Sequence, residues 1–360
     1  MTTWLLAGGG TAGHVNPLLA VADTIRRREP GDTVLVLGTQ EGLESRLVPA
    51  RGYELVVIPR LPFPRRPNGA ALRFAPALQR TIAGVADTIR RRGVDRVVGF
   101  GGYAAAPAYL AARRTRVPLA LHEANAKPGI ANRLGARLTD SVGVAFDGTP
   151  LRGARVVGMP LRREIETLDR AARRTEALEH FGLDPQRPVL LVTGGSLGAR
   201  RINATVVASA PALLAAGWSV LHIVGGKAEV SDPELPGYRM LDYCDRMELA
   251  LSAADAAVSR AGAATVSELT ALGIAAVYVP YPVGNGEQRF NARGVIEAGG
   301  GVLVDDAAFL PSFIDSTVVP MLSDRPRIAA MSAAAASVGV LDGADRMTDL
   351  AQSARTVSRR

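Results

Sequence analysis

The stretch WLLAGGGTAGH (4–14) places an apolar run directly before three consecutive glycines and a histidine. The apolar run has the length of a buried parallel strand, and the glycines permit the tight turn from which a helix starts. The chain repeats this arrangement in VLLVTGGSLGAR (189–200). Each copy is typical of a Rossmann-like domain, in which backbone N–H groups at the turn approach a phosphate. The sequence therefore predicts two such domains, with ligands in a cleft between the carboxyl edges of their sheets.

Strand and helix patterns alternate along the whole chain. We predict strands at 33–38, 54–59, 96–101, 118–123, 189–193, 219–225, 239–241, 256–259, 275–280 and 301–304. The clearest helices are predicted at 16–28, 42–51, 70–92 and 104–114, and each ends in or near arginines that suit a helix C-terminus. This alternation predicts an α/β fold with a doubly wound parallel sheet in each half.

The length of 360 residues exceeds the usual single core and favours two domains. The boundary is predicted after VVGMP (156–160), before a charged helix at 163–181. The domains are then 1–160 and 161–340. A last helix at about 340–355 is expected to pack back on the first domain.

The composition indicates in which cellular compartment the chain works and which partners it binds. The single cysteine cannot form an intramolecular disulfide and no signal-peptide pattern opens the chain, which favours the cytoplasm. No apolar run approaches the roughly 20 residues of a membrane span, so membrane contact is expected to be peripheral. Residues 1–160 carry 22 Lys and Arg against 11 Asp and Glu. This excess favours an anionic membrane or a phosphorylated substrate.

The charge excess also has an explanation that involves no function. Of the 42 basic residues 40 are arginine, as a coding bias toward arginine would give. Nucleic acid is not an expected partner, since aromatic residues make up 5% of the chain and no recognisable binding module is present. A nicotinamide dinucleotide is also disfavoured. Its fingerprint needs an acidic residue at the end of the second strand, where the chain reads LGTQ (37–40).

Three motifs of the first half place polar groups where strands are predicted to end. His14 follows the first glycine turn at a helix start, which lowers the proton affinity of an imidazole and makes it a candidate general base. FGGY (100–103) adds a second turn that suits a pyrophosphate. HEAN (122–125), with Asn132 beyond it, ends the next strand at the same edge. The alternative is that these histidines have a structural role only, packing in the core or capping a helix.

The second half carries SRAGAATVSEL (259–269), whose small residues bring the backbone close to a diphosphate. Glu268 lies about one turn into the predicted helix, where it suits two ribose hydroxyls, and Thr265 faces phosphate with the helix N–H groups. GNGEQRFN (284–291) suits sugar hydroxyls. A solvated helix charge at Glu268 and an ordinary surface turn at 284–291 are the structural alternatives.

In this order, the segments closely resemble the MurG family of glycosyltransferases. The resemblance runs from Leu5 to about Leu350 and is carried by GGTAGHVNP (9–17), GGY (101–103), HEAN (122–125), GGSLGA (194–199) and RAGAATVSE (260–268). It implies a GT-B fold, with the lipid acceptor bound by the first domain and the nucleotide sugar by the second. The implied reaction is inverting transfer of GlcNAc from UDP-GlcNAc to the C4 hydroxyl of MurNAc in undecaprenyl-diphospho-MurNAc-pentapeptide (lipid I), which makes lipid II for peptidoglycan.

The resemblance also implies roles for individual residues. His14 is the implied catalytic base, although Glu123 is not ranked against it. The donor would contact Thr11, Gly13, Asn125, Arg162, Ser196, Tyr243, Cys244, Met247, Ala264, Thr265, Glu268 and Gln288. The acceptor would contact Gly102, Tyr103, His122, Glu123 and Asn132. No cofactor and no obligatory bound metal are expected, because helix dipoles and polar groups would stabilise the leaving diphosphate.

Three residues depart from the pattern of the family. Ala12 stands where a glycine is usual, Ala124 where a Gln is common, and Met159 where an Asn is common. The two alanines should be tolerated where the backbone keeps negative φ. Met159 removes a polar contact and leaves the role of its loop open.

Membrane docking is predicted from LPFPRR (61–66), followed by Leu72, Phe74 and Leu78 with Arg73 and Arg80 in one helical stretch. Apolar residues flanked by arginines suit an anionic leaflet, here the cytoplasmic face of the cell membrane. A core-facing helix with solvated arginines is the alternative. Other proteins of cell-wall synthesis are candidate partners.

Two further classes of function share these motifs. One is another GT-B enzyme, either a glycosyltransferase for a different acceptor or a UDP-GlcNAc 2-epimerase; the turns at 101–103 and 122–125 argue against both. The other is a non-catalytic UDP-sugar-binding protein, whose binding residues would look the same. Loss of turnover with retained donor binding in a His14→Ala variant would separate an enzyme from a sensor.

Overall fold

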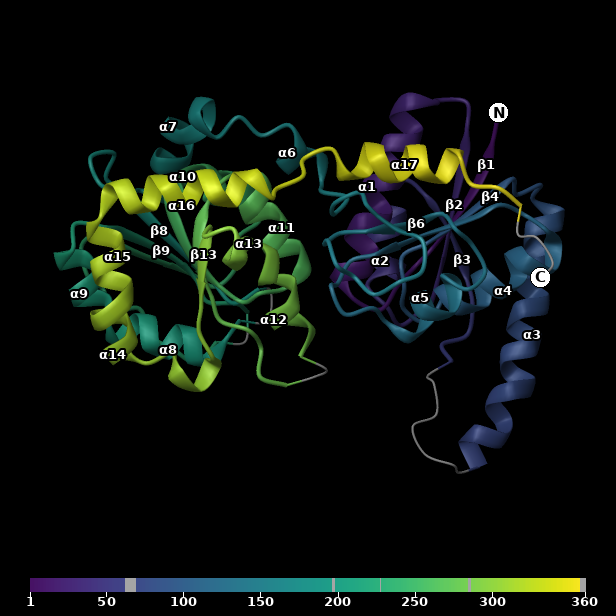
Figure 1. The fold of residues 1–360 in the computed structure, drawn as a ribbon, viewed down its shortest axis with the longest axis horizontal. Helices are drawn as coiled ribbons and strands as arrows, with labels where there is room; N and C mark the ends of the chain where they lie inside the picture. Colours follow the sequence, from purple (N-terminus) through teal and green to yellow (C-terminus); the bar gives the residue numbers. More distant parts are fainter. Residues whose placement is uncertain (62–68, 196–197, 227, 284–285, 357–360) are drawn as a thin grey trace. The chain divides into compact units, whose positions relative to one another are not determined.

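The chain divides into two compact units (Figure 1). The computed structural model describes residues 1–61, 69–195, 198–226, 228–283 and 286–356, with side chains given from residue 74 onward after the first gap. The N-terminal unit comprises Met1–Arg163 and Asp342–Arg360, and the C-terminal unit comprises Glu164–Leu341. The division therefore falls close to the boundary predicted after residue 160, and the last helix belongs to the N-terminal unit.

The N-terminal unit is built on a parallel sheet of seven strands in the order β3-β2-β1-β4-β5-β6-β7. The strands are β1 (Thr3–Ala7), β2 (Thr33–Gly38), β3 (Glu54–Val57), β4 (Arg96–Gly99), β5 (Leu119–Glu123), β6 (Val142–Val144) and β7 (Ala154–Val156). The helices are α1 (Ala12–Arg28), α2 (Glu44–Ala50), α3 (Gly69–Arg91), α4 (Ala105–Thr115), α5 (Ile130–Gly135) and α17 (Gly343–Gln352). Short α6 (Arg163–Glu166) begins where this unit ends.

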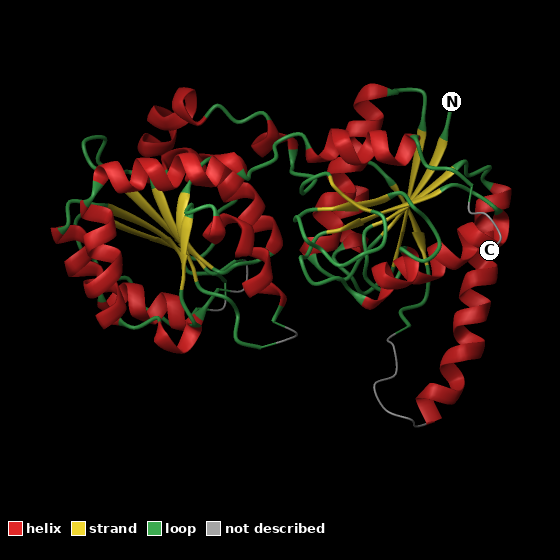
Figure 2. Ribbon diagram, viewed as in Figure 1, coloured by secondary structure: helices red, strands yellow, loops and turns green. Residues whose placement is uncertain are grey.

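Helices cover both faces of this sheet, as Figure 2 shows. Along β1, Leu5 and Ala7 pack with residues of α3 and α4, whereas Trp4 and Leu6 pack with α1, α2 and α17. This alternation explains why the strand reads as a continuous apolar run, since a parallel strand is buried on both faces. The hydrophobic core thus lies in two layers, and the carboxyl edge of the sheet is left for loops.

The C-terminal unit repeats the architecture with six parallel strands in the order β10-β9-β8-β11-β12-β13. The strands are β8 (Val189–Thr193), β9 (Ser219–Ile223), β10 (Tyr238–Leu241), β11 (Ala256–Ser259), β12 (Ala275–Tyr278) and β13 (Gly301–Leu303). The helices are α7 (Arg170–Phe181), α8 (Arg200–Ala208), α9 (Ala210–Ala215), α10 (Met247–Ala253), α11 (Ala263–Ala271), α12 (Glu287–Asn291), α13 (Arg293–Glu297), α14 (Pro311–Phe313), α15 (Val319–Ser323) and α16 (Arg325–Ser337). The predicted class of two Rossmann-like α/β domains is confirmed.

Three details differ from the sequence prediction. The helix predicted at 163–181 is broken into α6 and α7, and Asp169 caps α7 by accepting from the Ala172 N–H at 3.0 Å. Asp at an N-cap satisfies a free helix N–H, which favours a new helix start there. The short strand β6 was not predicted, and β7 was indicated only by the stretch before residue 160. Both have three residues, too few for a periodic pattern.

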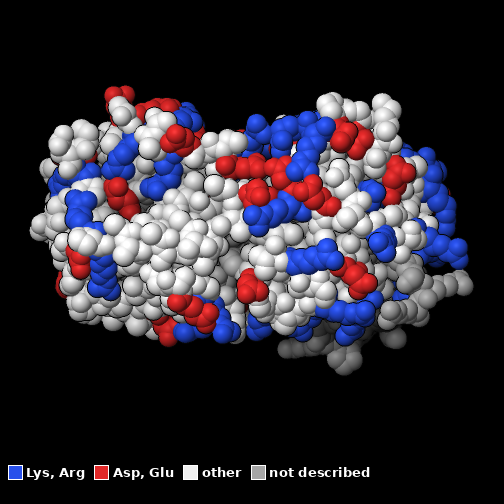
Figure 3. All heavy atoms as spheres, turned by 45° about the horizontal axis from the view of Figure 1, so that its top comes forward, with Lys and Arg blue, Asp and Glu red and all other residues white. Residues whose placement is uncertain are grey.

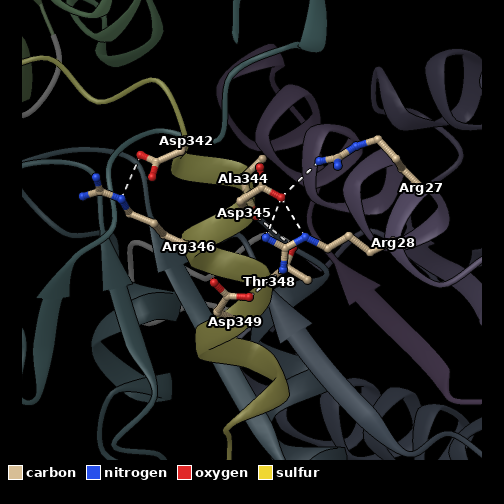
Figure 4. A network of polar contacts seen from close by, with 8 residues as sticks. All are labelled: Arg27, Arg28, Asp342, Ala344, Asp345, Arg346, Thr348 and Asp349. Atoms are coloured by element: carbon tan, nitrogen blue, oxygen red, sulfur yellow. Dashed lines mark hydrogen bonds and ion pairs between the residues drawn. The ribbon is translucent and has the colours of Figure 1, made fainter. Parts of the chain in front are cut away.

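Helix α17 packs on α1 although it comes from the other end of the chain. Met347 and Leu350 are buried in the same apolar layer as Trp4 and Leu6. Beside this contact, Arg27 and Arg28 of α1 pair with Asp345 at 3.0 and 2.6 Å, and Arg28 also reaches Asp349 at 2.5 Å (Figure 4). Although burial alone would raise it, the two arginines hold the pKa of Asp345 below its usual value.

The surface of the N-terminal unit carries most of the excess positive charge. On the face in Figure 3, Lys and Arg side chains spread over this unit, at the right, with acidic side chains between them. Among the described helices, none is both long and apolar enough to cross a membrane.

Candidate active site

The glycine turns lie where each sheet reverses its strand order. In the N-terminal unit the reversal falls between β1 and β4, and the turns at 8–11 and 100–103 follow these two strands. In the C-terminal unit it falls between β8 and β11, which are followed by 194–199 and 260–262. Ligands of open α/β sheets bind at such reversals, outside the carboxyl ends of the strands. The fold therefore places all four motifs at the expected edges.

His14 lies in the first turn of α1, and its ring is fixed by the glycine turn. The Nδ1 atom is 3.2 Å from the Gly9 carbonyl oxygen and 3.2 Å from Thr11 Oγ1. When Nδ1–H donates to Gly9, Nε2 keeps its lone pair and is the basic atom. Burial lowers the pKa of His14, an effect that Glu123, the Gly9 carbonyl and Glu44 partly oppose. The imidazole is therefore neutral and ready to accept a proton at neutral pH.

The second glycine turn packs directly on the first. Gly102 has φ +80°, and a Cβ there would stand 2.3 Å from the Gly9 carbonyl oxygen, so only glycine fits. A Cβ on Gly101 would stand 3.1 Å from Nε2 of His14. Beside this turn, Tyr103 is 37% exposed, and the Arg60 guanidinium lies 4.9 Å from its ring. The two turns thus form one surface, with the basic nitrogen of His14 at their junction.

Glu123 and Asn132 form a buried support below this junction. The Glu123 carboxylate accepts from the Asn125 N–H at 2.9 Å, the Gly129 N–H at 3.0 Å and Asn132 Nδ2 at 2.9 Å. Tyr109 OH donates to Asn132 Oδ1 at 2.6 Å. Because both oxygens of Glu123 accept hydrogen bonds from the protein, this carboxylate is suited to hold the loop after β5. His14 is the better placed of the two candidate bases.

Three of the residues expected to contact the acceptor are buried. His122, Glu123 and Asn132 are 1%, 3% and 2% exposed, so their side chains face the interior of the N-terminal unit. His122 Nε2 lies 2.9 Å from the Gly158 carbonyl oxygen, and burial lowers the pKa of the ring to about 4. These side chains support the strand end, whereas Gly102 and Tyr103 line the surface beside His14.

The departures from the family pattern fit the backbone. Neither Ala12 nor Ala124 has positive φ, so an alanine is unstrained at both positions. Met159 is buried, and its carbonyl oxygen would stand 2.3 Å from a Cβ on Gly343. The loop at 158–160 is thus held by His122 on one side and by the start of α17 on the other.

In the C-terminal unit, three predicted donor contacts share one side of α11. Ala264, Thr265 and Glu268 are partly exposed, at a spacing that brings them to one helical face. The N-cap residue of this helix is Gly262, which has no side chain that could cap it, and the first N–H groups of a helix attract an anion. The arrangement suits a diphosphate at the helix start and hydroxyl groups near Glu268.

The other predicted donor contacts are spread over several loops. Tyr243 is 60% exposed after β10, Cys244 is buried, and Met247 begins α10. Burial raises the pKa of the Cys244 thiol, which favours its protonated form. Gln288 Oε1 accepts from the Tyr281 N–H at 2.9 Å. Thr11, Gly13, Asn125 and Arg162 belong to the N-terminal unit and are at least partly exposed, and Ser196 lies outside the described residues.

Sequence reasoning did not assign a role to Arg260, which organises the edge of the second sheet. Its guanidinium pairs with Asp306 at 2.6 Å and donates to the carbonyl oxygens of Val279 and Pro280. Arg260 and Asp306 line a cavity of about 910 Å³ together with the first turn of α8 and Tyr281. The motif at 259–269 contains Arg260, but the spacing alone does not show that its side chain turns toward the loop after β12.

Two family models match the chain. They are the glycosyltransferase family 28 N-terminal domain over residues 4–144 and the glycosyltransferase family 28 C-terminal domain over residues 189–347. Together with the two sheets and their glycine turns, these matches define the class: the chain belongs to glycosyltransferase family 28 and has the GT-B fold.

Full-length relatives narrow the family further. The chain is 67% identical over 350 residues to a protein of Leifsonia xyli subsp. xyli, covering 97% of this chain and 98% of that protein. It is 66% identical over 355 residues to one of Clavibacter sepedonicus, covering 98% and 97%. Both are named UDP-N-acetylglucosamine--N-acetylmuramyl-(pentapeptide) pyrophosphoryl-undecaprenol N-acetylglucosamine transferase. The crystal structure of MurG from Acinetobacter baumannii matches with a TM-score of 0.81 and 26% identity, over 98% and 99% of the two chains. Within family 28, the chain belongs to the MurG family.

Proposed function

We propose that this protein transfers GlcNAc from UDP-GlcNAc to lipid I and so makes lipid II for peptidoglycan synthesis. The observation that carries the proposal is the 67% identity, over nearly the whole chain, to a relative named for this reaction. The geometry supports it, because a neutral His14 stands at the junction of two glycine turns at the carboxyl edge of a sheet. The N-terminal unit would bind the acceptor and the C-terminal unit the donor.

The reaction is a displacement at the anomeric carbon of GlcNAc. The C4 hydroxyl of MurNAc forms the new bond, His14 Nε2 takes the hydroxyl proton, and the bond to UDP breaks with its electron pair on the diphosphate. The charge that develops on UDP would be stabilised by the N-terminus of α11, where Gly262 is the N-cap residue. Attack opposite the leaving group converts the α-linked donor into a β-linked product.

Within this scheme the resemblance to the MurG family also implies a role for several donor contacts. Glu268 would bind the ribose, Thr265 and Ser196 the diphosphate, and Tyr243, Cys244 and Met247 would line the uracil pocket. Gln288 would reach the sugar. Support comes from the shared exposed face of Ala264, Thr265 and Glu268 on α11.

We also propose that the reaction needs no obligatory bound metal. Helix N-termini and arginines supply positive potential where the diphosphate would lie, which is the task a metal ion performs in other glycosyltransferases. Turnover should therefore survive treatment with EDTA. A loss of more than about 10-fold that added Mg²⁺ or Mn²⁺ restores would contradict this.

The protein is further proposed to work as a peripheral protein at the cytoplasmic face of the membrane. Most of the predicted docking segment, residues 62–68, lies outside the described residues, as do the side chains of Leu72 and Arg73. The described part of α3 supports the proposal only through the exposed Arg80 and the partly buried Phe74 and Leu78. Salt-sensitive flotation with phosphatidylglycerol vesicles, and none with phosphatidylcholine, is the expected result. Equal binding to both would contradict it.

The deciding experiment follows labelled GlcNAc from UDP-GlcNAc into a short-chain lipid I analogue, with UDP release in the absence of acceptor as the control. Acceptor-dependent formation of the disaccharide supports the proposal. Epimerisation or UDP release without acceptor would instead indicate a UDP-GlcNAc 2-epimerase. Transfer only to other acceptors would indicate a different glycosyltransferase. Donor binding without turnover would indicate a sensor.

A further inference from the structure

A buried carboxylate lies directly beneath the first glycine turn and has no part in the scheme above. Glu44, in the first turn of α2, is 0% exposed. Its Oε2 accepts from the Gly10 N–H at 2.8 Å, and its Oε1 accepts from the Thr39 N–H at 2.9 Å and from Thr39 Oγ1 at 2.8 Å. All three partners donate, which favours the ionised form. Although burial alone would raise it, these bonds hold the pKa of Glu44 below its usual value.

The glycines around Glu44 leave the room that its side chain fills. A Cβ on Gly9 would stand 2.3 Å from Oε1, one on Gly38 2.5 Å from Cγ, and one on Gly42 2.0 Å from Oε2. Real Cβ atoms essentially never approach other non-bonded atoms this closely, so a side chain at any of these three positions would force Glu44 to move. The glycine turn after β1, the end of β2 and the loop before α2 are therefore shaped around one carboxylate.

The same turn holds the proposed base. His14 Nδ1 contacts the carbonyl oxygen of Gly9, and the next N–H group along the chain, that of Gly10, binds Glu44. With ordinary peptide dimensions, these contacts put the carboxylate within about 8 Å of the imidazole. The other charged groups at this junction are Glu123 at the end of β5 and Arg60 beside Tyr103. Glu44 is thus a fixed negative charge linked to His14 through one peptide unit.

Occupation of the Gly10 N–H also changes the role of the turn. The sequence suggested that its N–H groups approach a phosphate, but this one already binds a buried carboxylate. A phosphate at the same place would meet a like charge, which is unfavourable. The turn is accordingly better suited to hold His14 than to bind a diphosphate at Gly10.

We propose that Glu44 is a positioning residue, which fixes the Gly9–Gly10 peptide that orients His14 and keeps a negative charge close to the imidazole. The proposal rests on the proposed function only in giving His14 the role of base. Its effect on the imidazole is a property of the free protein, so it can be tested without turnover.

The test is an NMR titration of the His14 ring in the full-length protein without ligands, assigned with a His14→Asn variant. Glu44→Gln keeps the size of the side chain but removes its charge. The titration midpoint of His14 should fall by about 0.5 pH unit or more, as expected for the loss of one charge within about 8 Å at a high effective dielectric. Glu41→Gln is the matched control, because Glu41 is an exposed carboxylate in the loop just before α2, and it should shift the midpoint by less than about 0.2 unit.

In the transfer assay, Glu44→Gln should lower kcat by about 10-fold or more and leave the KM for UDP-GlcNAc within about 2-fold. The acid limb of kcat should move with the NMR midpoint. An unchanged midpoint overturns the proposal whatever the enzyme does, whereas a shifted midpoint in a protein without turnover contradicts only the proposed function.

If Glu44→Gln does not fold, the Thr39→Val variant takes its place. This variant keeps the charge of Glu44 and removes one hydrogen-bond donor, so kcat should fall while the His14 midpoint stays unchanged. An unchanged kcat would then overturn the proposal.

Discussion

The His14 ring owes its chemical state to three neighbours and not to its position at a helix start alone. Its contact with the Gly9 carbonyl orients Nε2, burial lowers its pKa, and Glu123 and Glu44 limit that decrease. Since the pKa is lowered from its usual value, the neutral, basic imidazole predominates at pH 7, and its fraction falls as pH decreases through this pKa. The rate should follow the same curve.

Replacement of His14 by alanine should therefore lower kcat by about 10²- to 10⁴-fold, the usual contribution of a general base. The affinity for UDP-GlcNAc should change much less. The measurement is kcat across pH 5 to 8 beside calorimetric titration of the donor. A variant that keeps the wild-type pH profile would show that another group accepts the proton.

Gly102 tests the packing of the two turns. Gly102→Ala forces a Cβ to within 2.3 Å of the Gly9 carbonyl oxygen at φ +80°, so it should lower thermal stability and abolish most turnover. Gly148→Ala is a matched control, because that glycine has φ +69° with no atom within 4 Å of a Cβ, and it should cost only the backbone strain of about 1–2 kcal/mol. Equal effects of the two substitutions on stability and turnover would refute the close contact between the turns.

Two buried histidines should make stability depend on pH. Burial lowers the pKa of His122 and of His222 to about 4, one in each unit. In the unfolded chain both rings become protonated near pH 6.5. The free energy of unfolding should therefore be greatest above that pH and should fall as pH decreases toward 4, by up to about 3 kcal/mol for each ring. His222→Gln should weaken the pH dependence of the free energy of unfolding of the C-terminal unit between pH 7 and 5, as measured by urea denaturation. A slope as steep as that of the wild type would contradict this.

At the scale of single residues, the position of the site was predictable from the sequence, but the orientation of several of its side chains was not. Strand ends and glycine spacing predicted where His14, Gly102 and Tyr103 lie, because parallel strands bring these turns to one edge. The same reasoning did not show that His122 and Asn132 turn inward, since the face of a residue at a strand end depends on its neighbours in space. Glu44 was not predicted because two of its three partners are backbone N–H groups, which a sequence pattern does not reveal.

At the scale of elements, α17 shows which contacts hold a helix that returns from the far end of the chain. Its arginine–carboxylate pairs are prominent in Figure 4, but Arg28 is 27% exposed and Asp349 is 64% exposed. Exposed pairs contribute about 0–1 kcal/mol, whereas truncation of a buried Met or Leu costs about 2–5 kcal/mol. Apolar packing should therefore dominate the attachment of α17.

The corresponding prediction compares Met347→Ala with Arg28→Ala. The first should lower the free energy of unfolding of the N-terminal unit by about 2–5 kcal/mol and the second by about 1 kcal/mol or less. Only the second effect should shrink further in 0.5 M NaCl, because salt screens exposed charges. Chemical denaturation at low and high salt measures both. A larger loss from Arg28→Ala would mean that the ion pairs hold the helix.

Elements with an uninterrupted apolar run were predictable, whereas the short strand β6 and the break between α6 and α7 were not. The strands β2, β8 and β11 have the predicted bounds, because parallel strands buried on both faces read as uninterrupted apolar runs. The three-residue strands β6 and β7 carry too few residues for a pattern, and the break between α6 and α7 depends on a cap at Asp169. Their bounds are set by neighbours in the fold.

For the whole molecule, the central claim is that two Rossmann-like units of family 28 carry out one inverting transfer of GlcNAc to lipid I. The most direct test is to isolate the product formed from UDP-GlcNAc and a lipid I analogue and to determine its mass and its linkage by proton NMR. We predict one added GlcNAc, β-linked to the C4 oxygen of MurNAc, formed only when both substrates are present. An α-linked sugar, a linkage at another hydroxyl, or no acceptor-dependent product would contradict the account.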